Sequence, residues 1–316
     1  METRIKIGVS RCLLGDRVRY DGGHKRDPFL TDTLSIYVDY TPVCPEVEAG
    51  FPIPREAFRL VGDPEKPVMI TSKTGKDITD VMEKWSQRRV RELEKESLFG
   101  FIFKKDSPSS GMERVKVYNE KGMAEKKGVG IFAGIFMQHF PLIPVEEEGR
   151  LHDPILRENF IESIFSLKAW RETLSLRKSM AYIIDFHTRH KLLIMAHSVN
   201  HYRLMGRLVA VGKGRPISEV YREYEALLME ALKLKATVKK NANVLQHMMG
   251  YFKKDLSLYE KKELNEIIDQ YRREYIPLIV PITLINHYVY KYEQGYLRKQ
   301  VYLNPHPIAL KLRNHS

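Results

Sequence analysis

The chain has 316 residues, of which 43% are hydrophobic and 29% are charged, and 52 Lys and Arg against 40 Asp and Glu give a formal charge of +12. This composition predicts a folded protein of about two domains and excludes overall disorder. The sequence starts without the apolar core of a signal peptide, and no run approaches the ~20 apolar residues that span a bilayer. We therefore expect a cytoplasmic protein with no membrane partner.

The excess positive charge lies in the second half of the chain. Residues 1–150 hold 25 basic and 24 acidic side chains, whereas residues 151–316 hold 27 and 16, together with nine of the eleven histidines. This asymmetry predicts a near-neutral unit joined to a unit that binds a polyanion. A helical domain with a solvated Lys/Arg-rich face is the alternative.

Short apolar segments at residues 5–10, 36–43 and 101–104 have the composition of strands, and a helix is expected over residues 78–96. Strands that alternate with helices predict an α/β domain with a Rossmann-like parallel sheet, which we place at residues 1–145. Each strand runs directly into a polar loop. Because ligand sites lie beyond the carboxyl ends of parallel strands, we expect these three loops to converge.

Residues 146–153 are acidic, contain a glycine and lie between two prolines, so we expect a linker there. All-α patterns fill the second domain, residues 154–316. The expected helices, with breaks at Gly206 and at residues 213–216, cover 154–174, 178–210, 216–248, 259–274 and 281–294.

Cys12 and Cys44 occupy two of the three loops and are the only cysteines. Two cysteines do not make a disulfide scaffold, so in a reducing compartment they are free thiols, metal ligands or catalytic groups. Nearby Arg11 and Arg17 would favour the thiolate form. Buried, inert cysteines are the alternative.

Three further polar residues follow the strands. Glu46 is placed to act as a general acid or base, or is a solvated loop acid. Ser107 and Ser110 are suited to binding an anion or a polar substrate edge, or simply form a turn. Residues 19–26 form a basic glycine loop, but no Walker or dinucleotide fingerprint is present, so no nucleotide cofactor is expected.

In the helical half, His197 and His201 have the i,i+4 spacing of zinc ligands, but no glutamate of an HExxH motif lies between them. A basic surface with aromatic residues is the fuller interpretation, and it indicates RNA binding. The candidate phosphate contacts are Arg189, Lys191, Arg203, Arg207, Lys239, Lys240, Lys253 and Lys254, with Tyr202, Tyr251 and Phe252 as candidate stacking residues.

Several motifs bring known families into view. The segments VSRCLLG, VRYDGG, CPEVEAGFPIPR and SPSSG, in that order, resemble the TudS-like thiouracil desulfidase domain. The second half, with FHTRHKL, MAHS, NVLQHMMGYFK and PLIVPITLINH, resembles the YbgA-type domain. The combination is similar to the RudS architecture, whose members remove sulfur from 4-thiouridine in tRNA.

The resemblance implies a [4Fe–4S] cluster held by three cysteines, with one iron open to the thiocarbonyl sulfur. By motif position Cys12 and Cys44 match two ligands, Glu46 the acid/base carboxylate and Ser107 an assisting serine. The third ligand cysteine is replaced by Ser110. Three alternatives follow: Ser110 is the ligand, another group such as a carboxylate, His24 or a bound small molecule completes the set, or the cluster is lost.

The predicted function is therefore an iron–sulfur-dependent desulfidase that converts 4-thiouridine in tRNA to uridine and hydrosulfide. The target base must leave any stack to reach such a pocket. Two alternatives remain open: a non-catalytic tRNA- or nucleic-acid-binding protein with a degenerate desulfidase domain, and a desulfidase of free thiolated nucleobases.

Overall fold

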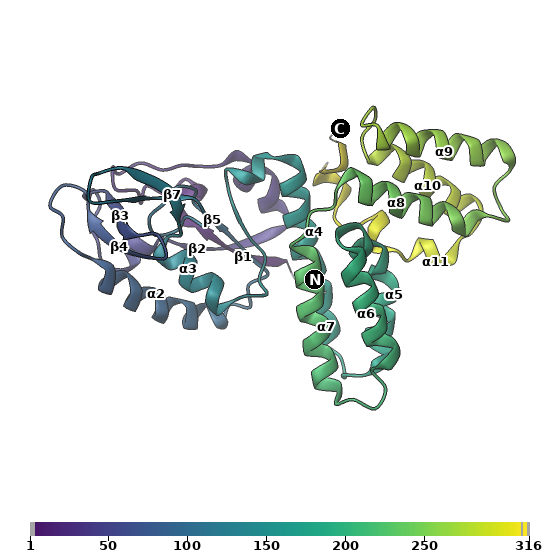
Figure 1. Ribbon diagram of the computed structural model, residues 1–316, viewed down its shortest axis with the longest axis horizontal. Coiled ribbons are helices and arrows are strands. Elements are labelled where there is room, and N and C mark those ends of the chain that lie inside the picture. Colours follow the sequence, from purple (N-terminus) through teal and green to yellow (C-terminus); the bar gives the residue numbers. More distant parts are fainter. Residues whose placement is uncertain (1–3, 311, 315–316) are drawn as a thin grey trace. The chain divides into compact units, whose positions relative to one another are not determined.

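The computed structural model describes residues 4–310 and 312–314, and the chain divides into two compact units, residues 1–153 and 154–316 (Figure 1). The first unit is α/β and the second is helical, so the predicted fold classes are confirmed. Among the described residues, no helix is both long and apolar enough to cross a membrane.

A fully parallel sheet lies at the centre of the first unit, with strand order β2-β1-β5-β8. Its strands are β1 (Ile5–Ser10), β2 (Val38–Val43), β5 (Gly100–Phe103) and β8 (Val145–Glu147). β1 is buried along nearly its whole length, as expected for a strand paired on both sides. A Cβ at Gly8 would lie 2.2 Å from the Phe101 ring, so glycine is required where this ring crosses β1.

A second sheet, with order β4-β3-β6-β7, was not predicted. Its strands are β3 (Phe58–Asp63), β4 (Lys66–Thr71), β6 (Val115–Tyr118) and β7 (Ala124–Gly128). Two antiparallel hairpins join through the parallel pair of β3 and β6. The first four residues of β7 are all exposed, so the sequence carries no apolar alternation that would indicate this strand.

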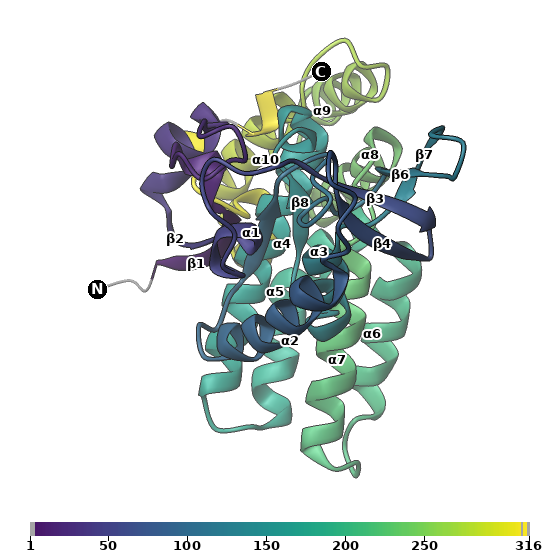
Figure 2. The ribbon, with the colours of Figure 1, turned by 90° about the vertical axis from the view of Figure 1, so that its left-hand side faces the viewer.

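Three α-helices belong to the first unit: α1 (Pro45–Glu48), α2 (Thr79–Glu94) and α3 (Ile131–His139). Phe132 and Phe136 of α3 pack against Phe101 and Phe103 of β5, and Trp85 of α2 packs against Phe132. α2 and α3 lie side by side (Figure 2). Their apolar residues pack against strands of both sheets.

Residues 146–153, where we expected a linker, are part of the first unit. Glu146 and Glu147 end β8 and are buried. The Glu147 carboxylate accepts a hydrogen bond from the Met112 backbone at 2.8 Å, and Glu146 pairs with Arg150 at 2.6 Å. The acidic run looked like a solvated linker because its partners lie up to 44 residues away in the sequence, as Lys104 does from Glu148.

The second unit consists of helices, with a core that joins residues from most of them. They are α4 (Pro154–Ser175), α5 (Met180–His197), α6 (Val199–Val211), α7 (Ile217–Leu232), α8 (Val238–Met249), α9 (Leu258–Arg272), α10 (Ile279–Lys291) and α11 (Gly295–Arg298).

Two of the predicted helices are split. Ser198 is extended and its hydroxyl accepts a hydrogen bond from the His201 backbone, so it ends α5 and caps α6. Thr237 caps α8 in the same way. The predicted break at Gly206 is wrong, because Gly206 lies inside α6. Serine and threonine act as N-caps here, and apolar periodicity on both sides concealed them.

Candidate active site

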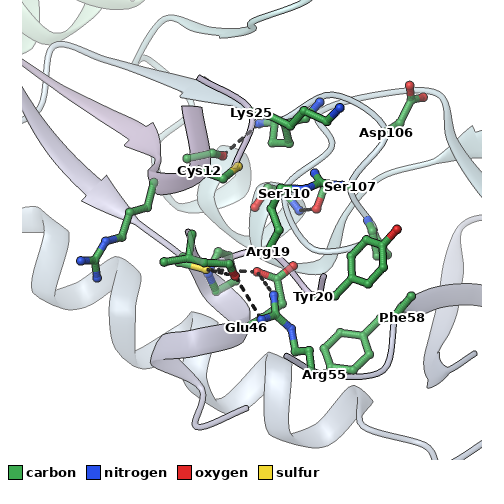
Figure 3. A pocket seen from close by; sticks show the side chains of 18 of the residues that line it. Cys12, Arg19, Tyr20, Lys25, Glu46, Arg55, Phe58, Asp106, Ser107 and Ser110 are labelled. Carbon is green, nitrogen blue, oxygen red and sulfur yellow. Dashed lines mark hydrogen bonds and ion pairs between the residues drawn. The ribbon is translucent and has the colours of Figure 1, made fainter. Parts of the chain in front are cut away.

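The loops after β1, β2 and β5 meet at one pocket of about 370 Å³ in the α/β unit (Figure 3). All five residues predicted to carry chemistry there line it, namely Cys12, Cys44, Glu46, Ser107 and Ser110. The strands are parallel and adjacent, so their carboxyl ends bring these distant loops to the same edge of the sheet.

Cys12 and Cys44 are free thiols. Burial raises the pKa of Cys12 to about 11, against the nearby charge of Lys104. Burial and then the Glu46 carboxylate raise the pKa of Cys44 to about 12. The positive charge that we expected to favour thiolates is thus outweighed by desolvation. A bound metal cation is the kind of partner that converts such thiols into thiolates.

Glu46 lies in the first turn of α1, beside Cys44, and is held from three directions. Its Oε2 lies 3.5 Å from the Cys44 Sγ and 3.7 Å from an Arg55 guanidinium nitrogen. Its Oε1 accepts a hydrogen bond of 2.5 Å from the Ser109 hydroxyl. This carboxylate is therefore fixed in the pocket wall and next to a candidate ligand.

The loop of residues 107–110 is shaped by its own serines. The Ser107 hydroxyl accepts hydrogen bonds from the backbone of Ser109 and Ser110, at 3.3 and 3.1 Å. Ser109 lies between, with its hydroxyl 3.0 Å from that of Ser107 and 3.5 Å from that of Ser110. A Cβ at Gly130 would lie 2.5 Å from the Ser109 carbonyl carbon, so glycine lets α3 begin against this loop.

Sequence reasoning missed four residues of this site. Ser109 holds Glu46, and Arg55 neutralises it; both belong to the motifs quoted above, but their roles need the fold. Tyr20 and Phe58 present their rings to the pocket (Figure 3). The Arg19 guanidinium lies 5.5 Å from the centre of the Tyr20 ring and the Arg55 guanidinium 5.9 Å from that of Phe58, which are cation–π distances. These rings offer a stacking surface for a planar ligand.

The wall and rim of the pocket carry more cations than anions. Its basic residues are Arg11, Arg19, Lys25, Arg55, Lys104 and Lys105, and its acidic residues are Glu46, Glu56 and Asp106. Several of the cations are ion-paired, for example Lys104 with Glu148. Lys25 and Lys105 are exposed and have no carboxylate partner among the described residues. A ligand with negative charge therefore suits this rim.

In the helical unit, the eight predicted phosphate contacts separate into groups. Lys191, Arg203 and Arg207 line one open pocket. Arg189 pairs with Asp185 at 2.9 Å, and the Lys240 ammonium donates to two backbone carbonyls of its own unit. Lys239, Lys253 and Lys254 are exposed outside that pocket. Of the candidate stacking residues, Tyr202 lines the pocket, Tyr251 is half-buried and Phe252 is a core residue.

The zinc arrangement of His197 and His201 does not form. Ser198 interrupts the helix between them, and His197 is fully buried with its Nε2 3.0 Å from Glu162. His201 instead has its Nδ1 2.9 Å from the Ser198 hydroxyl. Their i,i+4 spacing therefore does not place them on one helix face.

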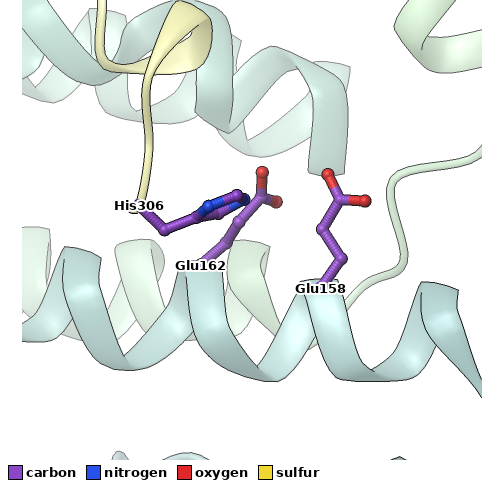
Figure 4. Close-up of side chains that lie close together, drawn as sticks. All are labelled: Glu158, Glu162 and His306. Atoms are coloured by element: carbon purple, nitrogen blue, oxygen red, sulfur yellow. The ribbon is translucent and has the colours of Figure 1, made fainter. Parts of the chain in front are cut away.

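A second group of ligand-type side chains, Glu158, Glu162 and His306, lies in the helical unit (Figure 4). Arg313 donates to both carboxylates, at 3.1 and 2.8 Å, and it is itself buried. Burial raises the pKa of Glu162, but the hydrogen bond from His197 and the charge of Arg313 outweigh it and lower that pKa. This group is an ion network closed by its own cation.

Models of two protein families match the chain. A 2-thiouracil desulfurase model matches residues 7–148, and a model for a family of unknown function, DUF1722, matches residues 191–307. Over 133 residues the chain is 33% identical to the uncharacterized protein YbgA of Escherichia coli K12, which covers 42% of this chain and 79% of YbgA. The chain therefore belongs to the family of YbgA, and its residues 7–148 match a 2-thiouracil desulfurase domain.

The chain has two further similarities, one to a curated protein and one to a solved structure. The uncharacterized protein YbbK of Bacillus subtilis is 28% identical over 141 residues, which cover 42% of this chain and 89% of YbbK. A solved structure, described as a [4Fe-4S]-dependent thiouracil desulfidase TudS, is 29% identical with a TM-score of 0.39; it covers 48% of this chain and 95% of that one. The match to an enzyme family is the 2-thiouracil desulfurase model over residues 7–148.

Proposed function

We propose that the chain removes sulfur from 4-thiouridine in tRNA, giving uridine and hydrosulfide, with a [4Fe–4S] cluster as cofactor. The observation that carries this proposal is the meeting of two thiols and a fixed carboxylate in one pocket with a cationic rim. The 2-thiouracil desulfurase match supports the reaction class.

The donor set of the pocket fits an iron–sulfur cluster in two positions and departs from it in a third. Cys12 and Cys44 are soft donors that reach the pocket from two adjacent strand ends. Ser110 lines the same pocket, and among the described residues its hydroxyl makes only a 3.5 Å contact, with the Ser109 hydroxyl, so it is available as the third donor. Bound there, the cluster would supply an iron Lewis acid that binds thiocarbonyl sulfur and withdraws electrons from the adjacent carbon.

The chain's own residues supply the proton transfers and the orientation. The reaction replaces C=S by C=O with one water and releases hydrosulfide and a proton, which leaves the new hydroxyl as C=O forms, so no electron donor is needed. Glu46 takes the proton from the attacking water and returns it to the departing sulfur. Ser109 holds Oε1 of Glu46, which leaves Oε2 beside Cys44 and Arg55. Tyr20 and Phe58 stack on the extruded base.

The charges favour a base within RNA over a free base. A thiolated nucleobase without its phosphates offers little to Lys25 and Lys105 at the rim, whereas a nucleotide in a chain brings a phosphate on each side. The YbgA-like half adds an excess of 11 positive charges over residues 151–316. Phosphate contacts by that half would hold the RNA while the base enters the pocket.

The test uses the full chain, reconstituted with iron and sulfide without oxygen, and tRNA that contains 4-thiouridine. Nucleoside mass spectrometry should show loss of 4-thiouridine and an equal gain of uridine. Glu46→Gln should keep its iron but lose activity by about 10²–10⁴-fold, because the proton acceptor is gone. Cys12→Ser should lose both iron and activity.

Two results would replace the proposal. Tight tRNA binding without any turnover would make the chain a binding protein, and Ser110 would mark a degenerate site. Turnover of free 4-thiouracil but not of tRNA would assign it to free bases. Full iron content in Cys12→Ser would remove that thiol from the ligand set.

A further inference from the structure

An open pocket of about 780 Å³ lies in the YbgA-like unit, lined by residues of α5 and α6. These two helices lie side by side (Figure 1). Lys191 belongs to α5, and Asn200, Arg203 and Arg207 follow one another along α6 at spacings of three and four residues. Such spacings place side chains on one helix face. The pocket is therefore a feature of two packed helices and does not depend on a loop.

No carboxylate lines this pocket, whereas three cations do. Arg203 and Arg207 are exposed and have no ion-pair partner among the described residues. The Lys191 ammonium lies 4.8 Å from the centre of the Tyr296 ring, a contact that holds the side chain without neutralising it. Elsewhere in this unit exposed cations are often paired, as Arg189 is with Asp185. Three unneutralised charges in one concavity favour an anion with more than one charge.

The floor of the pocket adds neutral donors and space. Burial lowers the pKa of His187 to about 4, so its ring is neutral near pH 7. Its Nδ1 lies 3.1 Å from the Tyr224 hydroxyl, which can donate to it and so leave the Nε2 hydrogen for another acceptor. Gly206 has no side chain, and a Cβ there would lie 3.9 Å from this Nε2, so the glycine keeps the floor open.

Aromatic rings extend the basic surface. Tyr202 lines the pocket, and the Tyr296 ring beneath Lys191 stacks on Tyr251 with centres 4.8 Å apart and planes at 19°. Proteins that bind single-stranded nucleic acid combine aromatic rings with nearby cations. The cations contact the phosphates and the rings stack on the bases.

We propose that the pocket lined by Lys191, Arg203 and Arg207 binds the phosphates of an RNA backbone and is the main RNA contact of the YbgA-like unit. The inference deepens the proposed function and rests on its RNA substrate. An open groove of this volume accepts a continuous backbone. A free nucleotide or inorganic phosphate shares the same chemistry, so the test must separate it from RNA.

The test measures binding of a fluorescent, unmodified tRNA transcript to the full chain by anisotropy at several salt concentrations. Unmodified tRNA has no sulfur to remove, so this measurement is independent of turnover. The double variant Arg203→Gln/Arg207→Gln should weaken binding on the order of 10–100-fold at 0.1 M salt, and should lower the salt slope by about 2. Arg91→Gln/Lys95→Gln removes the same charge from exposed positions of the α/β unit, outside the pocket, and should change affinity by less than about threefold.

A second variant keeps the charge and removes the space. Gly206→Leu fills the floor of the pocket in a helix interior where leucine is favourable, so the helix should persist. It should weaken tRNA binding at least tenfold, while thermal unfolding shows an intact helical unit. Equal affinities for both double variants, with Gly206→Leu unaffected, would overturn the pocket but leave the proposed function standing.

Two further outcomes are decisive. If inorganic phosphate or a mononucleotide at micromolar concentration displaced the tRNA, the pocket would be reassigned to a small anion. A single phosphate of an RNA chain binds only weakly by itself. If the wild-type chain binds no tRNA, both this inference and the RNA substrate of the proposed function fail. Normal tRNA binding without turnover would leave the pocket standing and remove only the desulfidase activity.

Discussion

Two clusters of buried titratable groups, one in each unit, differ in whether the chain itself supplies the neutralising charge. In the helical unit, Glu162 meets the imidazole of His197 and the guanidinium of Arg313, both within 3.0 Å. In the α/β unit, Cys12 and Cys44 line a pocket in which burial raises the pKa of both thiols. The first cluster is complete without a ligand, whereas the second has donors that become charged only when a cation arrives.

This difference separates structure from function better than residue type does. Glu158, Glu162 and His306 have the chemistry of a metal site, but Arg313 already supplies the positive charge. Cys12, Cys44 and Ser110 are a less typical set of metal ligands, yet they line an open pocket. A cluster that satisfies itself stabilises the fold, and a cluster that does not is a candidate for chemistry.

Removing the cation from the complete cluster should have the largest effect on stability. Arg313→Met leaves the carboxylates of Glu158 and Glu162 buried without it, and the free energy of unfolding of the helical unit should fall by about 3–5 kcal/mol. Urea unfolding would be followed by Trp170 fluorescence in a Trp85→Phe background, since each unit contains one tryptophan.

The matched control is Arg273→Met. Arg273 pairs with Asp269 at 2.8 Å, but its side chain is 61% exposed, so the loss should stay below about 1 kcal/mol. Similar losses in the two variants would contradict the view that burial makes the Arg313 network structural.

Acid should also destabilise the helical unit, through a buried histidine that has no carboxylate partner. Burial lowers the pKa of His190 to about 4. Between pH 6.5 and 4 the unfolded chain therefore binds a proton that the folded chain does not, and up to about 3 kcal/mol of stability is lost as the pH falls through this range. His190→Gln should flatten this dependence by about that amount, whereas His24→Gln, at an exposed site, should not.

In the incomplete cluster, Ser109 is expected to act as a positioning residue. Ser109→Ala removes the 2.5 Å hydrogen bond to Glu46, and kcat should fall about 10- to 100-fold with KM and iron content unchanged. Ser86→Ala is the control, because Ser86 is a fully buried serine of the same unit whose hydroxyl has no hydrogen-bond partner among the described residues. Equal kcat values would remove Ser109 from the site.

The smallest change is one atom at the third donor position. Ser110→Cys should slow the loss of iron in the presence of a chelator by about tenfold, because thiolate is a softer ligand than a hydroxyl oxygen. The visible absorption of the cluster would measure this loss. An unchanged rate would place Ser110 outside the ligand set, and Ser107→Cys would serve as the control for a thiol added elsewhere in the loop.

The sequence was sufficient where neighbours in the chain decide the structure. Apolar runs that end in polar loops located β1, β2 and β5, and parallel topology then brought Cys12, Cys44 and Ser107 together. It was insufficient where distant partners decide. The role of Ser109 depends on Glu46, which lies 63 residues away in the sequence, and the burial of Glu147 depends on Met112, which lies 35 residues away.

The Arg313 network also bears on how the chain is made. Glu162 is synthesised 151 residues before Arg313, an interval of roughly 8–30 seconds at 5–20 residues per second. All the strands of the α/β unit have been translated before α4 begins, so that unit can fold while synthesis continues. The helical unit, in contrast, can complete the Arg313 pairs of its α4 carboxylates only after residue 313 has been synthesised.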